Sequence, residues 1–240
     1  MEIRRFFVNQ SDICNGQVRL EGDEFAHFSR VLRYKVGYKA IVCANDGVER
    51  LCTVKEIGKS NAILCVDEER VADVKRKRVT LFAGLLKNNK LDFAIQKAVE
   101  LGVDEIVPFV SRNCAENKFS RERAEKIALE AAKQCGSAYL TRVCELATFD
   151  EVLNRFKEFD KVLFAYEAEK KNRIKDCDLS GENFALVIGA EGGFTKDETE
   201  LAKDNGACVV TLGRRILRAE TASIVSCALL LDVLGELDYE

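Results

Sequence analysis

Short stretches that alternate apolar and polar side chains fill the first part of the chain. Four of them have the β-branched and aromatic content of strands: residues 6–8, 39–44, 50–57 and 61–66. Turn-forming residues separate them at Asn45-Asp46-Gly47 and at Gly58-Lys59-Ser60-Asn61. The pattern predicts a small β-barrel.

One helix is expected to interrupt these strands, with Asp23 as its capping residue. Its apolar stripe is expected to consist of Phe25, Phe28, Val31 and Leu32. Three basic residues then lie at or near the polar side of the helix end: Arg30, Arg33 and Lys35.

From residue 79 onward the pattern changes to strands that alternate with helices. Strands are expected at residues 79–83, 105–110, 143–146, 162–166, 184–188 and 207–212. Helices are expected at residues 91–101, 120–134, 150–159, 196–205 and 219–234. This alternation predicts an α/β domain with a mainly parallel sheet covered on both faces. We place the boundary near residue 74, which gives domains 1–74 and 75–240.

Two loops follow buried strands near the end of the second domain. The first is Gly189-Ala190-Glu191-Gly192-Gly193-Phe194-Thr195, and the second runs from Leu212 to Ala222. Loops at the carboxyl ends of parallel strands are where open α/β sheets bind small molecules. Neither loop has the glycine spacing of a dinucleotide site or the Gly-Lys-Ser/Thr of a phosphate-binding loop. The ligand is therefore not expected to be a simple nucleotide phosphate.

The first loop has a plain structural interpretation and a ligand-binding one. Thr195 and Glu198 form a capping box, so the glycines could simply make a strand-to-helix turn. Three glycines around one glutamate are more than that turn requires. Because glycine permits positive φ and close backbone approach, we favour a ligand role.

The second loop is either a surface charge cluster or the wall of a pocket. Its charged residues Arg214, Arg215, Arg218 and Glu220 lie beside the apolar Ile216 and Leu217. In a pocket wall, the apolar side chains would pack against a flat ring and the arginines would face an anionic polymer.

The charge distribution leaves open whether part of the chain contacts nucleic acid. The 240-residue chain is 47% hydrophobic and 32% charged, with a net charge of −3, which argues against indiscriminate nucleic-acid binding. Residues 1–78, however, carry 15 Lys or Arg against 12 Asp or Glu. The run Lys75-Arg76-Lys77-Arg78 is either a solvated linker or a nucleic-acid contact surface.

The cysteines and the lone histidine exclude several chemistries. None of the 10 cysteines forms a C-x-x-C pair, and His27 is the only histidine, so no zinc site is expected. Ser-His-Asp and Cys-His catalysis are disfavoured for the same reason, which leaves His27 structural or RNA-facing. No signal peptide and no membrane-length apolar run is apparent. We therefore expect free thiols in a reducing cytoplasm.

Motifs along nearly the whole chain resemble the RsmE family, the 16S ribosomal RNA uridine-N3 methyltransferases of the SPOUT (α/β-knot) superfamily. They comprise residues 4–8, His27 with 31–33, 93–103, 111–112, Glu130 with 134–136, and both loops; the most specific is Leu-Gly-x-Arg-Ile-Leu-Arg-x-Glu-Thr-Ala at 212–222. Two positions depart from the family pattern. Ala190 stands where the family has proline, and Ser137 stands where it has arginine.

This resemblance implies a PUA-like RNA-binding β-barrel and a SPOUT methyltransferase domain with a deep trefoil knot, a feature that periodicity cannot reveal. It implies an obligate homodimer with the active site at the interface, and neither a metal nor a membrane. It implies methyl transfer from S-adenosyl-L-methionine to N3 of uridine 1498 in the 16S RNA of the small ribosomal subunit.

Residue roles follow by position. The cofactor pocket would use Leu163, Phe164, Ala165, Ile188, Gly189, Glu191, Gly192, Gly193, Leu212, Gly213, Ile216, Leu217, Thr221 and Ala222. As a mechanistic hypothesis, Glu191 and Glu220 are candidate bases, and Arg112 and Arg218 are candidate stabilisers of the uracil anion or of the flanking phosphates. The RNA backbone would be held by Arg4, Arg5, Arg33, Lys75, Arg76, Lys77 and Arg78.

Two rival functions stay open at this point. One is a non-catalytic RNA-binding or ribosome-assembly protein that keeps the fold. The other is a SPOUT enzyme that acts on another RNA or on another atom of uridine.

Overall fold

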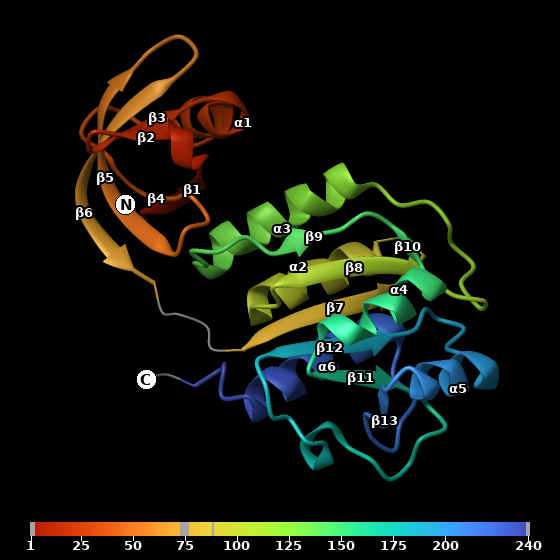
Figure 1. Cartoon of the computed structure of the whole chain (residues 1–240). Coiled ribbons are helices and arrows are strands. Elements are labelled where there is room, and N and C mark those ends of the chain that lie inside the picture. Colours follow the sequence, from red (N-terminus) through yellow and green to blue (C-terminus); the bar gives the residue numbers. More distant parts are fainter. Residues whose placement is uncertain (1–2, 73–76, 88, 239–240) are drawn as a thin grey trace. The chain divides into compact units, whose positions relative to one another are not determined.

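The computed structural model describes residues 3–72, 77–87 and 89–238 (Figure 1). The chain divides into two compact units. The first contains Met1–Val74 together with Ala132–Leu140, and the second contains Lys75–Ala131 and Thr141–Glu240. The first unit thus includes a segment from much later in the chain.

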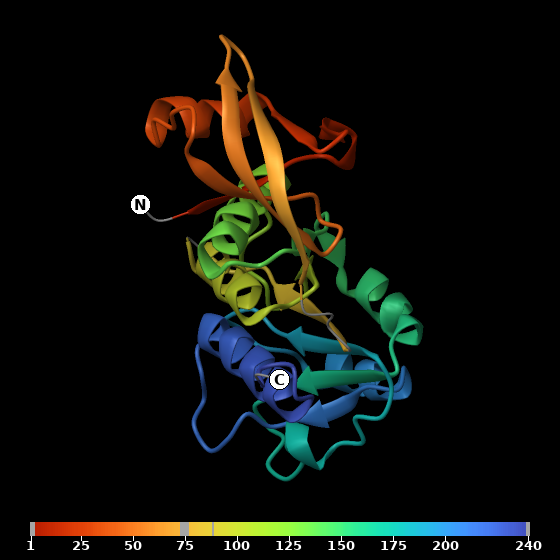
Figure 2. The same cartoon turned by 90° about the vertical axis from the view of Figure 1, so that its left-hand side faces the viewer.

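The first unit is built on a curved six-stranded sheet that forms a half-barrel. Its strands, in the order β1-β4-β5-β6-β3-β2, are β1 (Arg4–Phe7), β4 (Lys39–Cys43), β5 (Val48–Ile57), β6 (Ala62–Val71), β3 (Gln17–Leu20) and β2 (Ile13–Cys14). β1 and β4 pair in parallel, and the remaining neighbours are antiparallel. Figure 2 shows β5 and β6 as a long hairpin.

An aromatic cluster fills the concave side of this sheet. Phe28 is fully buried, and its ring centroid lies 5.5 Å from that of Phe6 and 4.6 Å from that of Tyr34. Leu20 and Leu64 are also fully buried in the same cluster. Burying these side chains is the main stabilising contribution in a unit of this size.

The inserted helix differs from its prediction in two ways. α1 (Gly22–Ala26) has Glu21 as its N-cap residue and continues as a π-helical turn, η2 (His27–Val31). Asp23 lies inside the first turn, so its predicted capping role is wrong, although a carboxylate there still favours the helix N-terminus. Val31 is 66% exposed and does not belong to the buried stripe, because the wider π-helical turn rotates it away from Phe28.

The hairpin of β2 and β3 was not predicted from the sequence. Asn15 and Gly16 make its turn, with φ angles of 51° and 69°. Two successive positive φ angles are the geometry of a type I′ turn, for which Asn-Gly is the preferred sequence. The local signal was therefore present.

The second unit contains an all-parallel sheet, as predicted. Its strands, in the order β10-β8-β7-β12-β11-β13, are β10 (Ala147–Thr148), β8 (Glu105–Val110), β7 (Arg78–Gly84), β12 (Asn183–Ile188), β11 (Lys161–Ala165) and β13 (Cys208–Val210), and β9 (Arg142–Val143) also pairs with β8. The strand expected at 143–146 is largely wrong: only Val143 lies in a strand, and the two short strands β9 and β10 flank residues 144–146. The predicted fold class, a parallel α/β domain preceded by a small β-domain, is confirmed.

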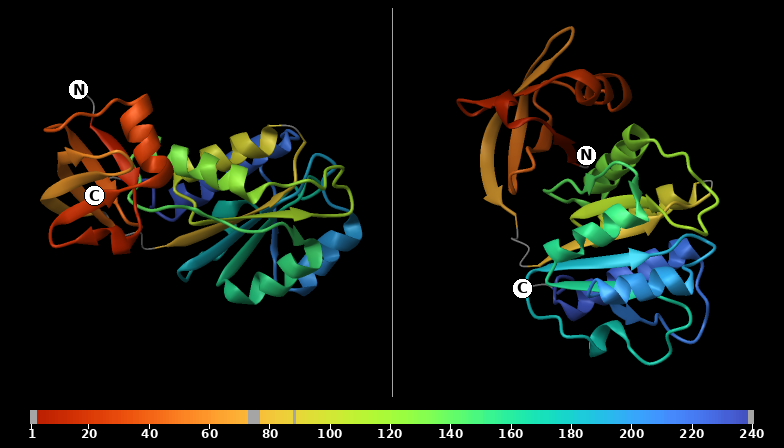
Figure 3. Two further views of the ribbon diagram at one scale, coloured as in Figure 1. Left: turned by 90° about the horizontal axis from the view of Figure 1, so that it is seen from above. Right: turned by 45° about the vertical axis from the view of Figure 1, so that its right-hand side comes forward.

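Helices cover both faces of this sheet. They are α2 (Lys90–Leu101), α3 (Arg121–Cys135), α4 (Phe149–Arg155), α5 (Lys196–Asp204) and α6 (Ala219–Val233). α2 and α6 lie on one face, and α4 and α5 lie on the other (Figure 3). Short 3₁₀ turns are η1 (Gln10–Asp12), η3 (Phe156–Glu158) and η4 (Ile174–Asp176), and η3 replaces the last turn of the helix expected at 150–159.

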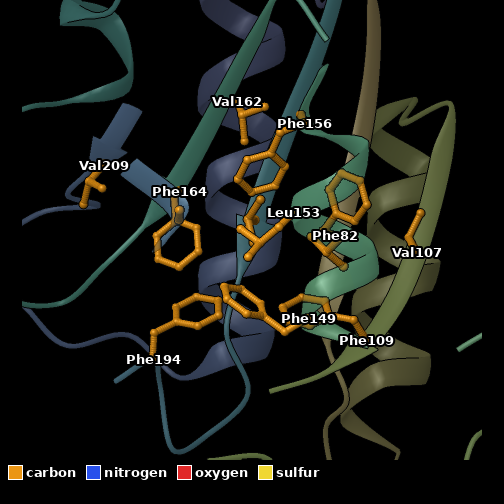
Figure 4. Close-up of a cluster of buried hydrophobic side chains, with 14 residues drawn as sticks. Phe82, Val107, Phe109, Phe149, Leu153, Phe156, Val162, Phe164, Phe194 and Val209 are labelled. Atoms are coloured by element: carbon orange, nitrogen blue, oxygen red, sulfur yellow. The ribbon is translucent and has the colours of Figure 1, made fainter. Parts of the chain in front are cut away.

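Phenylalanines dominate the core between the sheet and the α4–α5 layer (Figure 4). Phe82 and Phe109 come from β7 and β8, Phe164 comes from β11, and Phe149 comes from α4. Phe194 joins them from the loop that follows β12. A loop residue thus takes part in the main hydrophobic core.

Two predicted helix-end signals are confirmed in this unit. Gly102 ends α2 in the left-handed conformation at φ 95°, as expected of a C-terminal glycine. Thr195 and Glu198 form the predicted capping box at the start of α5. Both signals depend on neighbouring residues alone.

The cysteines are free thiols in the structure. Burial raises the pKa of Cys52 and of Cys227 to about 12, so both remain protonated small hydrophobes. Over the described ranges no cluster of His, Cys, Asp or Glu is arranged to hold a metal ion. Within the same ranges, none of the helices is long and apolar enough to cross a membrane.

Candidate functional site

A cavity of about 240 Å³ lies at the carboxyl edge of the parallel sheet, entirely within the second unit. Its walls come from three consecutive strand ends, after β11, β12 and β13, and from the start of α6. They are Ala165 to Glu167, Ile188 to Phe194, Thr211 to Leu217, Ala219 and Ala222. Both loops singled out in the sequence therefore face one cavity.

Close backbone packing determines the path of the first loop. A methyl group added at Gly84, the last residue of β7, would lie 2.3 Å from the amide nitrogen of Ala190. One added at Gly189 would lie 3.0 Å from Cε2 of Phe194. Glycine is required at Gly84 because the loop backbone occupies the space of a side chain there.

Phe194 holds the far end of this loop in the core. Its ring centroid lies 4.2 Å from that of Phe164 and 5.9 Å from that of Phe149 (Figure 4). Gly193, immediately before it, has a φ of 62°. The chain thus turns sharply at Gly193 and then enters the core, which leaves the preceding glycines at the cavity wall.

The second loop is open and cationic. Ile216 is 86% exposed, and Gly213 has a φ of 122° with free space where a side chain would be. The side chains of Arg214, Arg215 and Arg218 are exposed, and within the described ranges no carboxylate pairs with any of them. These guanidinium groups are available to an anionic ligand.

All but three of the residues predicted to bind a cofactor line this cavity. Leu163 and Phe164 are fully buried in β11 and lie in the core rather than at the cavity. Thr221 is exposed on α6 and does not line the cavity either.

Three lining residues lie outside the two loops and were not predicted: Tyr166, Glu167 and Thr211. Glu167 matters most, because the position of a methyl group at Gly193 is only 3.0 Å from its Oε1 atom. Its carboxylate has no hydrogen-bond partner among the described residues. Glu167 follows β11 just as the two loops follow β12 and β13, so the strand-end rule applied to all three strands would have found it.

Two donors bind one oxygen of the Glu191 carboxylate. Its Oε1 accepts a hydrogen bond from Lys90 Nζ at 2.9 Å and from the Lys87 amide at 3.3 Å. Partial burial alone would raise the pKa of Glu191, but these hydrogen bonds outweigh it and hold that pKa below its ordinary value. A carboxylate held in this way is a weak base, which disfavours the predicted base role of Glu191.

Glu220 has the opposite environment. Its Oε2 atom is buried and has no hydrogen-bond partner within the part of the chain that the structure describes. Glu220 lies on the first turn of α6, next to the cavity residue Ala219, but neither Glu220 nor Arg218 itself lines the cavity. An unpartnered buried carboxylate oxygen is costly and usually marks a functional group that awaits a partner.

The two arginines predicted to stabilise the uracil anion lie on different elements of the second unit. The Arg112 side chain is 63% exposed, and its Nη1 atom lies 3.1 Å from Asp197. Arg218 is the N-cap residue of α6. No hydrogen bond or ion pair joins Arg112 to Arg218, Glu191 or Glu220 among the described residues.

The predicted RNA-contacting residues fall into different settings. Arg5 is nearly buried and pairs with Glu49 at 2.6 Å, so its guanidinium is not available to an RNA phosphate, and we remove it from the RNA-contacting set. Arg4 and Arg33 are exposed. Lys77 bonds to the Gly181 carbonyl, Arg78 begins β7, and Lys75 and Arg76 lie outside the described residues.

Comparison with known proteins identifies both units. Residues 73–231 match the model of the RNA methyltransferase domain, and residues 20–66 match that of the RNA methyltransferase PUA domain. The ribosomal RNA small subunit methyltransferase E of Bacillus subtilis is 33% identical over 222 residues, which cover 85% of this chain and 86% of that protein. The protein of the same name from Rickettsia conorii is 31% identical and covers 95% of both chains.

The chain belongs to the ribosomal RNA small subunit methyltransferase E family.

Solved structures agree with this family assignment. The crystal structure of a ribosomal RNA small subunit methyltransferase E from Neisseria gonorrhoeae, bound to S-adenosyl methionine, aligns with a TM-score of 0.87 at 25% identity. The alignment covers 97% of this chain and 98% of that one. The fold of the family is therefore present from the first strand to the last helix.

Proposed function

We propose that this protein transfers a methyl group from S-adenosyl-L-methionine to N3 of uridine 1498 in the 16S RNA of the small ribosomal subunit. The observation that carries the proposal is the cavity shared by the two loops, in a chain of the ribosomal RNA small subunit methyltransferase E family. The loop that carries the most specific family motif forms one wall of that cavity.

The residues around the cavity fit this cofactor. Ile188, Leu212 and Leu217 would pack against the adenine ring, and the backbone amides near Gly192 and Gly193 would meet its polar groups. The unpartnered carboxylate of Glu167 suits the ribose hydroxyls or the cationic amino group. When bound, S-adenosyl-L-methionine supplies a methyl group carried on a positively charged sulfur.

The chemical task left to the protein is to remove a proton from uridine N3. This proton is weakly acidic, so a base must take it before or while N3 attacks the methyl group. Glu220 is the better candidate, because its buried Oε2 atom has no partner among the described residues, whereas Glu191 is bound by Lys90. The remainder of the rate enhancement comes from holding N3 in line.

Arginines would stabilise the negative charge that develops on the uracil oxygens. Arg218 is the N-cap residue of α6 and Glu220 lies in its first turn, so both would approach the substrate from the same helix end. Arg112 sits on the turn that packs against the first loop. N3 lies on the Watson–Crick edge, so the target uridine has to be unpaired or flipped out of a helix.

Contacts to the RNA backbone would come from the first unit and from the start of the second. Arg4, Arg33, Lys77 and Arg78 remain in this set, with Lys75 and Arg76. Such contacts position the substrate without reading its sequence.

Three further features belong to the same proposal: a trefoil knot around the cavity, a homodimer with the active site at its interface, and action in the cytoplasm. The dimer is supported by apolar side chains on two helices that pack together. Phe93 on α2 is 47% exposed, and Leu229 and Val233 on α6 are 43% and 45% exposed. A second copy would cover them.

Primer extension tests the proposal. Undermethylated small ribosomal subunits are incubated with the protein and S-adenosyl-L-methionine, and the 16S RNA is then reverse-transcribed. N3 methylation blocks base pairing, so a new stop is expected at uridine 1498. A stop elsewhere would indicate a different target, and binding without any stop would indicate a non-catalytic RNA-binding protein.

A further inference from the structure

Glu198 is a buried carboxylate whose hydrogen bonds come from two different segments of the second unit. It lies on the first turn of α5 and is only 3% exposed. Its Oε2 atom accepts hydrogen bonds from the Thr195 amide at 2.8 Å and from the Thr195 hydroxyl at 2.9 Å. Its Oε1 atom accepts a third, at 2.8 Å, from the amide of Arg112. Among the described residues no Lys or Arg forms an ion pair with Glu198.

The third hydrogen bond reaches a different part of the fold. Arg112 belongs to a turn after β8 that is closed by a hydrogen bond from the Cys114 amide to the Ser111 carbonyl. Thr195 belongs to the loop after β12. Glu198 therefore joins the turn at Ser111–Cys114 to the first cavity loop.

A second set of contacts joins the same two segments. Asn113 Nδ2 donates to the Gly192 carbonyl at 3.1 Å. A methyl group added at Gly192 would lie only 2.6 Å from the Asn113 carbonyl oxygen. The turn thus packs directly on the loop that lines the cavity, although the turn itself does not line it.

The burial of Glu198 is more than helix capping requires. A capping box uses one side-chain oxygen, and such residues are normally solvated. Burying a carboxylate is unfavourable unless every acceptor position is used. Here the second oxygen is used by the Arg112 amide, which makes the link to the turn the distinguishing feature of this residue.

We propose that Glu198 is a positioning residue: it clasps the Ser111–Cys114 turn onto the first loop. In this way it sets the shape of the cofactor cavity and holds Arg112 beside the first loop. This inference rests on the proposed function, because it takes S-adenosyl-L-methionine as the ligand of the cavity.

The Glu198→Gln variant tests the hydrogen bond to the Arg112 amide separately from the capping box with Thr195. Glutamine serves in a capping box as well as glutamate does, so the helix start is retained. Its single oxygen cannot serve both the Thr195 amide and the Arg112 amide. Because Thr195 offers two donors and Arg112 only one, the oxygen is expected to stay at Thr195. The side-chain NH₂ group then faces the Arg112 N–H, and that hydrogen bond is lost.

The chain supplies a matched control in Glu151, at the same position of the capping box that starts α4. Its Oε2 atom accepts from the Thr148 amide at 2.7 Å and from the Thr148 hydroxyl at 2.9 Å, and among the described residues it has no third bond to another segment. Glu151→Gln therefore makes the same chemical change without affecting a hydrogen bond between two segments.

The experiment measures the calorimetric Kd for S-adenosyl-L-methionine, together with hydrogen exchange of the Arg112 amide, in the full chain. We expect Glu198→Gln to raise Kd by about tenfold and to speed Arg112 exchange, because a buried hydrogen bond to a charged group is lost. Glu151→Gln is expected to leave both unchanged. Asn113→Ala, which removes the second contact of the turn, is expected to raise Kd as well.

Equal Kd values for wild type and Glu198→Gln would overturn the clasp. If Glu198→Gln does not fold, Asn113→Ala is measured in its place. A wild-type Kd for S-adenosyl-L-methionine in Asn113→Ala would then overturn the proposed link between the turn and the first loop. Failure of the wild-type protein itself to bind S-adenosyl-L-methionine would overturn the proposed function instead. Kinetics add a further distinction: a clasp raises KM for the cofactor, whereas simple destabilisation lowers the amount of active enzyme and leaves KM unchanged.

Discussion

The ring of Phe194 packs on the ring of Phe164, with their centroids 4.2 Å apart. Phe194 ends the glycine-rich loop, and Phe164 is a fully buried residue of β11. The contact ties a ligand-facing loop to the rigid core of the sheet. It explains how a loop with glycines at positions 189, 192 and 193 can keep one shape.

Phe194→Ala should therefore impair both stability and cofactor binding. Truncating a buried phenylalanine costs roughly 3–5 kcal/mol in the free energy of unfolding. Phe156→Ala is the control, because Phe156 is buried in the same cluster but belongs to η3. We expect both variants to lose stability in urea unfolding, and only Phe194→Ala to bind S-adenosyl-L-methionine more weakly at a temperature where both are folded. Equal binding in the two variants would contradict the role of Phe194.

Gly193→Val should abolish cofactor binding. Valine is strained at a φ of 62°, and its side chain would press on the carboxylate of Glu167. Gly206→Val carries comparable backbone strain at a φ of 90°, but it has free space around it and lies outside the cavity. Each change should cost about 1–3 kcal/mol of stability. A normal binding isotherm for Gly193→Val would remove the first loop from the cofactor site.

Glu220→Gln should reduce turnover and leave cofactor affinity close to that of wild type. Losing a general base costs typically 10²–10⁴-fold in rate. Glu200→Gln is the control, since Glu200 is an exposed residue of α5. Single-turnover methylation measures the effect. Full activity of Glu220→Gln would exclude Glu220 as the base and return attention to Glu191.

The ion pair of Lys90 and Glu191 should give a pH-dependent stability contribution. The pKa of Glu191 is lowered from the ordinary value of 4.5, so the contribution is present above that value and is lost as the pH falls through the lower, folded-state pKa. Lys90→Met should therefore destabilise the protein at neutral pH and differ less from wild type in acid. Because both side chains are about one-third exposed, we expect the effect to be small. An equal difference in the free energy of unfolding between Lys90→Met and wild type at pH 3 and at pH 7 would contradict this prediction.

Features that depend on neighbouring residues were predictable from the sequence. The capping box at Thr195, the glycine stop at Gly102 and the parallel strand pattern all came directly from local chemistry. The Asn15-Gly16 hairpin was equally local and was missed. The exposure of Val31 was not predictable, because it depends on a π-helical turn that the apolar spacing of the sequence does not indicate.

The site was only partly predictable for a related reason. The two loops are recognisable because their glycines and arginines stand out in the sequence. Glu167 and the third hydrogen bond of Glu198 depend on segments that meet only in the folded sheet. The pairing of Arg5 with Glu49 likewise joins β1 to β5, which no local pattern specifies.

The most direct test of the account is nucleoside mass spectrometry of 16S RNA from undermethylated small subunits treated with the protein and isotope-labelled S-adenosyl-L-methionine. We predict one labelled 3-methyluridine, located in the fragment that contains uridine 1498, and its loss with the Gly193→Val variant. Label found in another nucleoside, on a ribose 2′-oxygen or nowhere in the RNA would contradict the central claim.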